Sequence, residues 1–381
     1  MVNENLVFKE GHLCFDTEDL LIKICNPPFS FQRINEGFIM RREVGKGMKG
    51  NPTQFIFPKI IKIKPSTAGL IVGEGHLGKN FIFCNSDEKV IKEILRFLFQ
   101  FNKKLHFVFE VATKNMHPNF INDSKKKWEN IIKEDIESVR LRNEFNNTTE
   151  KGNIHISLYN TLFVKILKEI IEKIKIEAEN HGEISKDYLR GILAAEGNIN
   201  VKGTTTNCLY MVRISASKQK ERDHYKKCLE KIGIKISCKD MPTISPEEGI
   251  KLGWKTDKGR AGAVIISRWE NFVKVLKLGL LNLHNEKKIK FLKYFRNNKF
   301  TKQFLDFACF IKKEFTMKQA QNYFKFKGRH LKRVLTLYKK GYISRRKINR
   351  RDYVYKLTKE YMRLYNKFIE EGLIPSFQSN S

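Results

Sequence analysis

The sequence predicts an α+β protein made of two similar halves followed by a helical C-terminal module. Three observations support this prediction. Two apolar, small-residue segments, 67–75 and 189–197, each end in a glutamate followed by a glycine. Similar helical and extended segments follow each copy, in the order helix, strands, helix, strands, helix. Beyond residue 300 the pattern changes to short helices.

The composition favours a globular protein with a polyanionic partner. The chain has 381 residues, 41% of them hydrophobic, which is enough to bury a core in two or three domains. Its 73 Lys and Arg against 41 Asp and Glu give a formal net charge of +32. A positive charge of this size favours nucleic acid as the partner, and an anionic membrane surface is the alternative. An AT-rich genome, which enriches Lys, would account for part of the excess.

The sequence also predicts where the protein resides. No apolar run approaches the roughly 20 residues that cross a bilayer. Residues 1–5 have neither the basic nor the apolar region of a signal peptide. We therefore expect a cytoplasmic protein without membrane association, in a prokaryotic host, with an organelle as the alternative. The seven cysteines contain no C-x-x-C pair, so we expect reduced thiols and no structural zinc site.

Residues 1–65 form an N-terminal extension to which the sequence assigns no chemistry. Pro27-Pro28, three glycines and short apolar stretches favour a small β-rich segment packed on the domain that follows. The alternative is an arm that contacts DNA. Four cations would serve that arm: Arg41, Arg42, Lys46 and Lys49.

The first half is predicted to span residues 66–180. An insert rich in Lys and Asn interrupts it. Apolar periodicity gives the elements after the motif helix in chain order: strand 80–84, helix 90–98, strand 105–111, strand 154–157 and a helix through 163–168.

The second half is predicted to span residues 181–298 and to repeat this order. Its elements after the motif helix are strands 198–202 and 209–214, a helix through 225–229, the apolar segment 232–236, strand 262–267 and a helix through 272–277. The segment Phe-Val-Lys-Val-Leu-Lys at 272–277 matches Phe-Val-Lys-Ile-Leu-Lys at 163–168 almost letter for letter. An internal duplication explains two such matches in the same order better than chance similarity of amphipathic pairs does.

Residues 300–370 resemble a winged helix-turn-helix. Thr316 to Gln319 fits a capping box, a basic helix follows at 329–338, and a basic hairpin follows at 345–355. Such a module places its second helix in the major groove and its wing on the backbone, whereas the alternative is a small helical bundle with a charged face. The candidate DNA-binding residues are Arg329, Lys332, Arg333, Arg345, Arg346, Arg350 and Arg351.

Small residues in the two motif segments predict a close pair of helices. Gly69 and Gly73 lie four residues apart, and Gly191 precedes Ala194 and Ala195 at three- and four-residue spacing. These positions form a low ridge along each helix, which lets two backbones approach more closely than leucine side chains would allow. We expect this packing to bring the two terminal glutamates together.

Glu74 and Glu196 are the candidate catalytic and metal-binding residues. Each lies in the last turn of its helix, where the helix dipole opposes a negative charge, and Gly75 and Gly197 are expected to cap the helices in the left-handed conformation. Mutual repulsion adds to this cost. Two carboxylates in such positions are explained if divalent cations lie between them, and oxygen ligands suit Mg²⁺. The chemistry predicted is metal-assisted hydrolysis of a phosphodiester.

Both segments resemble the LAGLIDADG helices of homing endonucleases, and the element order resembles the αββαββα repeat of that family over residues 65–298. The resemblance implies a saddle of two curved sheets and a monomer that makes Mg²⁺-dependent double-strand breaks in a long DNA target. Glu74 and Glu196 would bind the metal with the backbone carbonyls of Gly73 and Ala195. Glutamate replaces aspartate at both metal positions, which keeps the charge and lengthens the arm.

Further site residues are carried over from the resemblance by position. A basic residue near the hydrolytic water would be Lys255, Lys258 or His284. Polar alternating positions after each motif are candidates for contacts with bases and phosphates, because one face of each sheet must face the groove. These positions are Lys79, Asn80, Asn198, Asn200, Lys202 and Arg213.

Three other functions fit parts of the sequence. A DNA-binding regulator could keep the endonuclease fold without cutting, and an RNA maturase could use the same basic surface to bind intron RNA and assist splicing. Residues 73–78 also satisfy G-x-G-x-x-G, but the segment after Gly78 is strand-like where a dinucleotide site needs a helix. An intein origin is not expected, since the chain begins with Met1 and lacks a terminal His-Asn.

Overall fold

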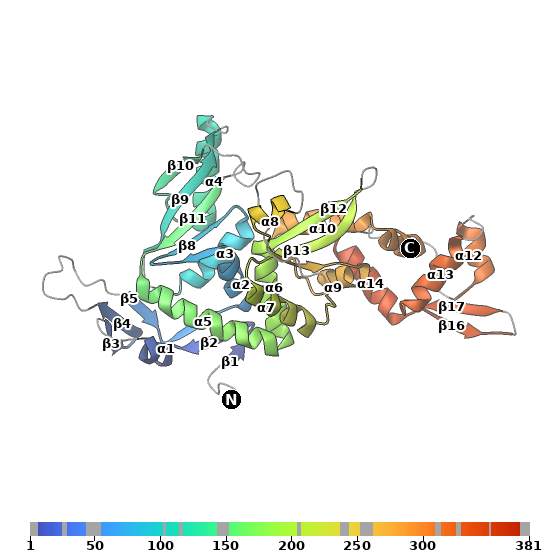
Figure 1. Cartoon of the computed structure of the whole chain (residues 1–381), viewed down its shortest axis with the longest axis horizontal. Coiled ribbons are helices and arrows are strands. Elements are labelled where there is room, and N and C mark those ends of the chain that lie inside the picture. The colour runs from blue at the N-terminus through green and yellow to red at the C-terminus, as the bar shows by residue number, and fades with distance from the viewer. Residues whose placement is uncertain are drawn as a thin grey trace, which may run out of the picture. The chain divides into compact units, whose positions relative to one another are not determined.

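The computed structural model describes residues 7–24, 29–42, 55–101, 104–113, 117–142, 152–203, 207–236, 244–251, 262–308, 314–324, 329–349 and 352–373. Within these ranges the chain is a mixed α+β protein whose strands form several small sheets (Figure 1). The α+β class predicted from the sequence is therefore confirmed. No helix in these ranges is both long and apolar enough to cross a membrane.

The chain divides into two compact units. Unit 1 contains Met1–Asn198, Val212–Ile266 and Gly279–Lys287. Unit 2 contains Ile199–Met211, Ser267–Leu278 and Lys288–Ser381. Both motif helices belong to unit 1, whereas the residues of the predicted second half are shared between the two units.

The N-terminal extension is β-rich, as predicted. One sheet has the order β1 (Val7–Lys9), β2 (His12–Asp16), β6 (Ile60–Ile63), and the other has the order β3 (Phe29–Ile34), β4 (Gly37–Arg42), β5 (Phe55–Pro58). Helix α1 (Thr17–Ile24) follows β2. The buried ring of Phe55 contacts Phe101 and Phe163, so the extension packs on the first half within unit 1. Lys46 and Lys49 lie outside the described residues, as do the side chains of Arg41 and Arg42.

The first half contains every element predicted for it. These elements are α2 (Pro65–Glu74), β7 (Gly75–Leu77), β8 (Phe81–Asn85), α3 (Glu88–Leu98), β9 (His106–Ala112), β11 (Asn153–Leu158) and α5 (Thr161–Asn180). The insert adds α4 (Pro118–Ile132) and β10 (Ser138–Arg142), for which the sequence predicted no structure. The five strands form one sheet in the order β10-β9-β11-β8-β7.

The second half contains α6 (Gly182–Glu196), β12 (Gly197–Lys202), β13 (Cys208–Ser215), α7 (Gln219–Lys231), α8 (Pro246–Lys251), β14 (Ala263–Ile266) and α9 (Trp269–Lys277). Its strands have the order β12-β13-β14, and Val212–Ser215 of β13 pairs antiparallel with β14. The short helix α8 was not predicted from the sequence.

Unit 2 is built around aromatic side chains. Phe272 of α9 contacts Phe291 and Phe295 of α10 (Asn285–Arg296). Phe304 of α11 (Lys299–Ala308) stacks on Tyr361 of α14 (Lys359–Glu370) at 4.2 Å between ring centroids. Phe368 of α14 contacts both Phe295 and Phe304, so aromatic packing in unit 2 extends across residues 298–300.

The C-terminal residues carry the predicted helices and hairpin. Thr316 and Gln319 form the capping box at α12 (Met317–Phe324), with Thr316 N donating to Gln319 Oε1 at 2.8 Å. Helix α13 (Arg329–Lys339) and the hairpin of β16 (Ile343–Lys347) and β17 (Tyr353–Leu357) follow. A short strand that was not predicted, β15 (Phe315–Thr316), pairs with β17.

Candidate metal site at the paired motif helices

The two motif helices, α2 and α6, pack backbone against backbone. A Cβ added to Gly191 would overlap the carbonyl oxygen of Ser66 and lie 2.7 Å from Leu70 N. A Cβ added to Gly69 would overlap the carbonyl oxygen of Tyr188, and one added to Gly73 would overlap Ala195 Cβ. The close packing predicted from small residues is therefore confirmed, because no larger side chain fits at these positions.

The two helix ends differ from the prediction in their backbone conformation. Gly75 has φ −79° and ψ 134°, and Gly197 has φ −71° and ψ 133°, so both are extended and the expected left-handed caps are wrong. Each glycine instead begins a strand, β7 or β12, directly after the glutamate. Glycine is still needed there, since a Cβ on Gly197 would overlap the carbonyl oxygen of Leu193.

The two glutamates lie near each other at these helix ends and are only partly exposed. Asn85 Nδ2, at the end of β8, donates a hydrogen bond of 2.6 Å to Glu74 Oε2. Burial raises the pKa of Glu74 to about 7, and the neighbouring Glu196 carboxylate adds to this shift. Burial also raises the pKa of Glu196. A cation placed here would stabilise two carboxylates that are otherwise costly to ionise.

Glu196 also borders an accessible cavity of about 360 Å³. The cavity lies within unit 1, at the ends of α6 and β13 and the start of α7. Its oxygen-bearing residues include Ser215, Ser217 and Glu221. A small cation or a phosphate could therefore reach Glu196 from solvent.

Among the described residues, Lys287 is the cation whose charge acts on both glutamates and lowers the pKa of each. Its ammonium donates hydrogen bonds to the backbone carbonyls of Ala194 and Ala195, the latter at 2.7 Å, and lies 3.4 Å from the carbonyl oxygen of Leu193. Burial lowers the pKa of Lys287 to about 8, while Glu74 and Glu196 favour its charged form. The lysine thus places a positive charge at the carbonyl end of α6, where the helix dipole favours one.

Asp87 connects the Lys287 segment to the first half. Its Oδ1 caps α3 by accepting hydrogen bonds from Lys89 N and Val90 N. Its Oδ2 accepts a hydrogen bond of 3.1 Å from Asn285 N and lies 3.2 Å from His284 Nδ1. A single buried carboxylate therefore fixes the chain two residues before Lys287.

His284, one of the three predicted basic auxiliaries, lies in this contact. It is paired with Asp87, and burial lowers its pKa. Its contacts are those of a side chain that positions the segment, whereas Lys287 is the cation at the glutamates. The other two candidates, Lys255 and Lys258, lie outside the described residues.

The residues present fit a hard divalent cation such as Mg²⁺. Two partly buried carboxylates supply oxygen ligands, and Mg²⁺ usually keeps several waters and needs only one or two carboxylates from the protein. Over the described ranges no three His, Cys, Asp or Glu side chains converge as a preformed cage. One predicted ligand, the carbonyl of Ala195, accepts a hydrogen bond from Lys287, so Glu74 and Glu196 are the ligands that the geometry favours.

The predicted DNA-binding residues of the two hairpins lie in different surroundings. Lys79 is exposed and Asn80 is partly buried in the turn between β7 and β8. Asn198 is exposed at the start of β12, Asn200 is partly buried on the same strand, and Arg213 is partly buried on β13. Lys202 Nζ lies 5.5 Å from the centre of the Tyr210 ring.

The predicted DNA-binding residues of the C-terminal module are described in part. The guanidinium of Arg345 stacks against Tyr338 and Tyr353, at 4.5 and 4.7 Å from the ring centres. Arg346 is exposed and lies 3.9 Å from a Glu314 carboxylate oxygen. Arg329, Lys332 and Arg333 belong to α13, but their side chains lie outside the described part of the chain, as do Arg350 and Arg351 entirely.

Sequence reasoning missed Asn85, Asp87 and Lys287. The run Asn85-Ser86-Asp87 before an amphipathic segment is a helix-capping signal, so Asp87 could have been assigned as a cap. No local signal distinguishes Lys287 from Lys288 or Lys290, because its role depends on a contact with residues more than ninety positions away. A scan against models of known families and a search of curated proteins find no match to this chain.

Burial of Glu74 makes a prediction for stability. Its pKa is raised from 4.5 to about 7, so the stability associated with its proton is present below about pH 4.5 and is lost as the pH rises through about 7. Relative to Glu74→Gln, the wild type should lose roughly 1 to 3 kcal/mol of unfolding free energy between about pH 5 and pH 8. Denaturant unfolding at both pH values measures this difference.

The control for this measurement is Glu183→Gln, in the exposed first turn of α6. It removes one carboxylate without changing the pair at the helix ends. Relative to Glu183→Gln, the wild type should lose no unfolding free energy over the same pH range. If the wild type loses as much relative to Glu183→Gln as it does relative to Glu74→Gln, burial of Glu74 is not the cause of the loss.

Proposed function

We propose that this protein is a Mg²⁺-dependent endonuclease that makes double-strand breaks in a long DNA target. One observation carries the proposal. Two partly buried glutamates, raised in pKa, lie near each other at the ends of two helices whose backbones touch, with a lysine ammonium beside them. Two acids and one cation, with one of the acids, Glu196, bordering an accessible cavity, are the groups that metal-assisted phosphodiester hydrolysis requires.

The order of the elements supports membership of the LAGLIDADG homing endonuclease family. The first half runs α2-β7-β8-α3-β9-β11-α5 around its insert, and the second runs α6-β12-β13-α7-β14-α9. Both begin with a motif helix that passes directly into a hairpin, though β7 has 3 residues and β12 has 6. Over the described residues the second half has one strand fewer than the αββαββα pattern, and the short helix α8 lies between α7 and β14. We infer two pseudo-symmetric repeats of the αββαββα type in one chain, and hence a monomer that supplies both acids of the site.

The charge and the C-terminal module support DNA as the substrate. The formal net charge of +32 favours a polyanion. In unit 2, helices α12 and α13 precede a hairpin whose first strand carries exposed Arg345 and Arg346. We infer a winged helix-turn-helix that adds affinity or specificity, with α13 in the major groove and the hairpin on the backbone.

Each residue of the site has a definite role in this proposal. Glu74 and Glu196 would hold the cation, which when bound neutralises phosphate charge and lowers the pKa of a water. Asn85 orients the Glu74 carboxylate through its hydrogen bond. Lys287 is held by three carbonyl oxygens at the end of α6 and supplies positive charge where the phosphate charge increases in the transition state.

The role of Lys287 can be tested by substitution. Lys287→Met is expected to lower the cleavage rate by about a hundredfold, comparable to removing one preorganised donor, with little change in DNA affinity. Lys290→Met, at an exposed position of the same helix, is the matched control. Single-turnover cleavage and equilibrium binding separate the two effects. Equal cleavage by the two variants would remove Lys287 from the mechanism.

The experiment that tests the function is selection of a target followed by cleavage. The full chain would select duplexes from a randomised DNA library, and the enriched duplex would then be incubated with the protein and Mg²⁺ or with a chelator. We expect linear product with both strands cut, only when Mg²⁺ is present. Metal-independent binding without cutting would instead support a transcriptional regulator. Preferential binding of intron RNA with enhanced splicing would support a maturase.

A further inference from the structure

The insert of the first half adds a strand to the edge of the unit 1 sheet. The segment containing α4 and β10 lies between β9 and β11 in the chain, yet β10 pairs with β9 at the outer edge of the sheet. The pairing is parallel, with Arg140 beside Glu110 and Arg142 beside Ala112. The sheet is therefore one strand wider than the motif pattern predicts, by about 4.8 Å.

The two faces of this sheet have different surroundings. Phe81 of β8 contacts Phe163 of α5, and Phe163 also contacts Phe97 of α3, so these helices cover one face. Val139 and Leu141 of β10 pair with Phe109 and Val111 and so share the face of those buried residues, although at the sheet edge they remain 39% and 44% exposed. Because side chains alternate along a strand, Arg140 and Arg142 lie on the opposite face.

A buried glutamate anchors these two arginines. Glu110 is 1% exposed and its Oε2 lies 2.7 Å from Arg142 Nε and 3.9 Å from Arg140 Nη1. The same oxygen lies 3.2 Å from His155 Nε2 on β11. The side chains of Arg140 and Arg142 nevertheless remain 59% and 51% exposed. One carboxylate thus forms ion pairs with two guanidinium groups, the closer one with Arg142, and leaves an excess of positive charge at the surface.

We infer that β10 is a phosphate-binding strand, which extends the DNA-contacting surface of unit 1 by one strand. Arg140 and Arg142 contact the sugar-phosphate backbone of duplex DNA, at one end of the bound segment, and Glu110 is their positioning residue. The inference rests on the proposed function and adds to it a backbone contact that lengthens the protected target. Phosphate contacts of this kind do not discriminate between bases.

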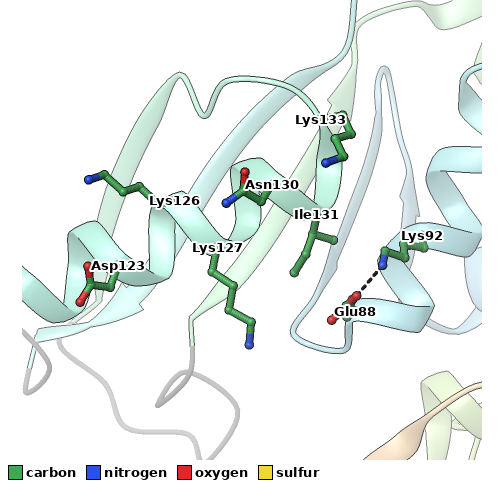
Figure 2. Close-up of a pocket in the computed structure, with 8 residues that line it drawn as sticks. All are labelled: Glu88, Lys92, Asp123, Lys126, Lys127, Asn130, Ile131 and Lys133. Carbon is green, nitrogen blue, oxygen red and sulfur yellow. Dashed lines mark hydrogen bonds and ion pairs between the residues drawn. The ribbon is translucent and has the colours of Figure 1, made fainter.

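The other cationic surface of the insert is less suited to this role. Helices α3 and α4 border a cavity of about 630 Å³, where Figure 2 shows lysines interspersed with acids. Lys92 is paired there with Glu88, and Asp123 lies on the same helix as Lys126 and Lys127. The cavity adjoins α3, which belongs to the layer of helices that covers the sheet. Its exposed lysines therefore supply a charge-matched control.

The test compares two double variants in DNA binding. The double variant Arg140→Gln with Arg142→Gln should lower DNA affinity about tenfold at 0.15 M salt. It should also reduce the magnitude of the slope of log K against log salt by about 2, because each lost phosphate contact reduces that slope by about 0.9. Hydroxyl-radical footprinting should show protection lost at one end of the target only. Lys126→Gln with Lys127→Gln removes the same charge and should leave the slope and the footprint unchanged.

Glu110→Gln tests the positioning role. It keeps both arginines but releases them, so affinity should fall while the salt slope stays near that of the wild type; circular dichroism checks that the sheet is folded. An arginine double variant that binds like the lysine double variant would overturn the inference and leave the proposed function standing. A wild-type chain that binds no DNA would overturn both.

Discussion

Glu74→Gln and Glu196→Gln are each expected to lower the rate of double-strand cleavage by about a thousandfold or more, with DNA binding retained. The physical reason is the loss of one of the two negative ligands that the helix-end glutamates supply. Glutamine keeps the shape of the side chain and can still bind a cation weakly through its oxygen, but without charge. The loss of one charged metal ligand removes several kcal/mol of transition-state stabilisation, and about 4 kcal/mol corresponds to a thousandfold.

The measurement needs readouts besides cleavage. Binding of Ca²⁺ by calorimetry reports on the metal site itself, and gel mobility reports on DNA affinity. Both variants should lose calcium affinity, whereas Glu172→Gln, with a side chain 65% exposed on α5, should not. Cleavage that persists in both variants would show that these glutamates are not the catalytic acids. Normal calcium binding with lost cleavage would place the metal elsewhere.

The paired helices could be predicted because their signal is local. Glycines and alanines at three- and four-residue spacing within ten residues are sufficient to specify close helix packing, and the glutamates then follow from their position. The backbone of Gly75 and Gly197 was predicted wrongly for a related reason. A glycine after a helix is usually a left-handed cap, but here a paired strand begins at that residue, and pairing requires an extended backbone.

The inserted α4 and β10 were missed because tertiary context overrides composition there. The helix buries only Trp128 and Ile132 among its 15 residues, so its apolar periodicity is faint. All five residues of β10 are exposed, and as an edge strand it is determined by pairing with β9 rather than by burial. Lys287 was missed since its contacts with α6 join distant parts of the sequence.

The substitution expected to damage the fold most is Gly191→Ala, at the centre of the helix interface. The added methyl would overlap the carbonyl oxygen of Ser66 and lie 2.7 Å from Leu70 N. Both obstacles are backbone atoms of α2, so no rotation of a side chain can relieve the overlap. The two helices must separate, which breaks the contacts of buried Ala68, Leu70 and Ile192 along the same interface.

The expected loss of unfolding free energy is about 2 kcal/mol or more, measured by denaturant titration. Overpacking of a rigid interface destabilises a protein by roughly 1 to 3 kcal/mol and occasionally more. The higher helix propensity of alanine offsets at most about 1 kcal/mol of this loss. Gly182→Ala is the matched control in the first turn of the same helix. A Cβ there would meet its nearest atom, the Lys231 carbonyl oxygen, at 3.8 Å, an ordinary contact.

The same substitution connects the fold to the chemistry. The touching backbones of α2 and α6 bring Glu74 and Glu196 together. A wider interface therefore separates the two carboxylates and weakens the electrostatic attraction that both exert on one cation. Gly191→Ala should therefore lose calcium affinity even at temperatures where it remains folded, whereas Gly182→Ala keeps it. A folded Gly191→Ala protein with wild-type calcium affinity would show that the metal site does not depend on this close approach. The glycine would then be required for stability alone.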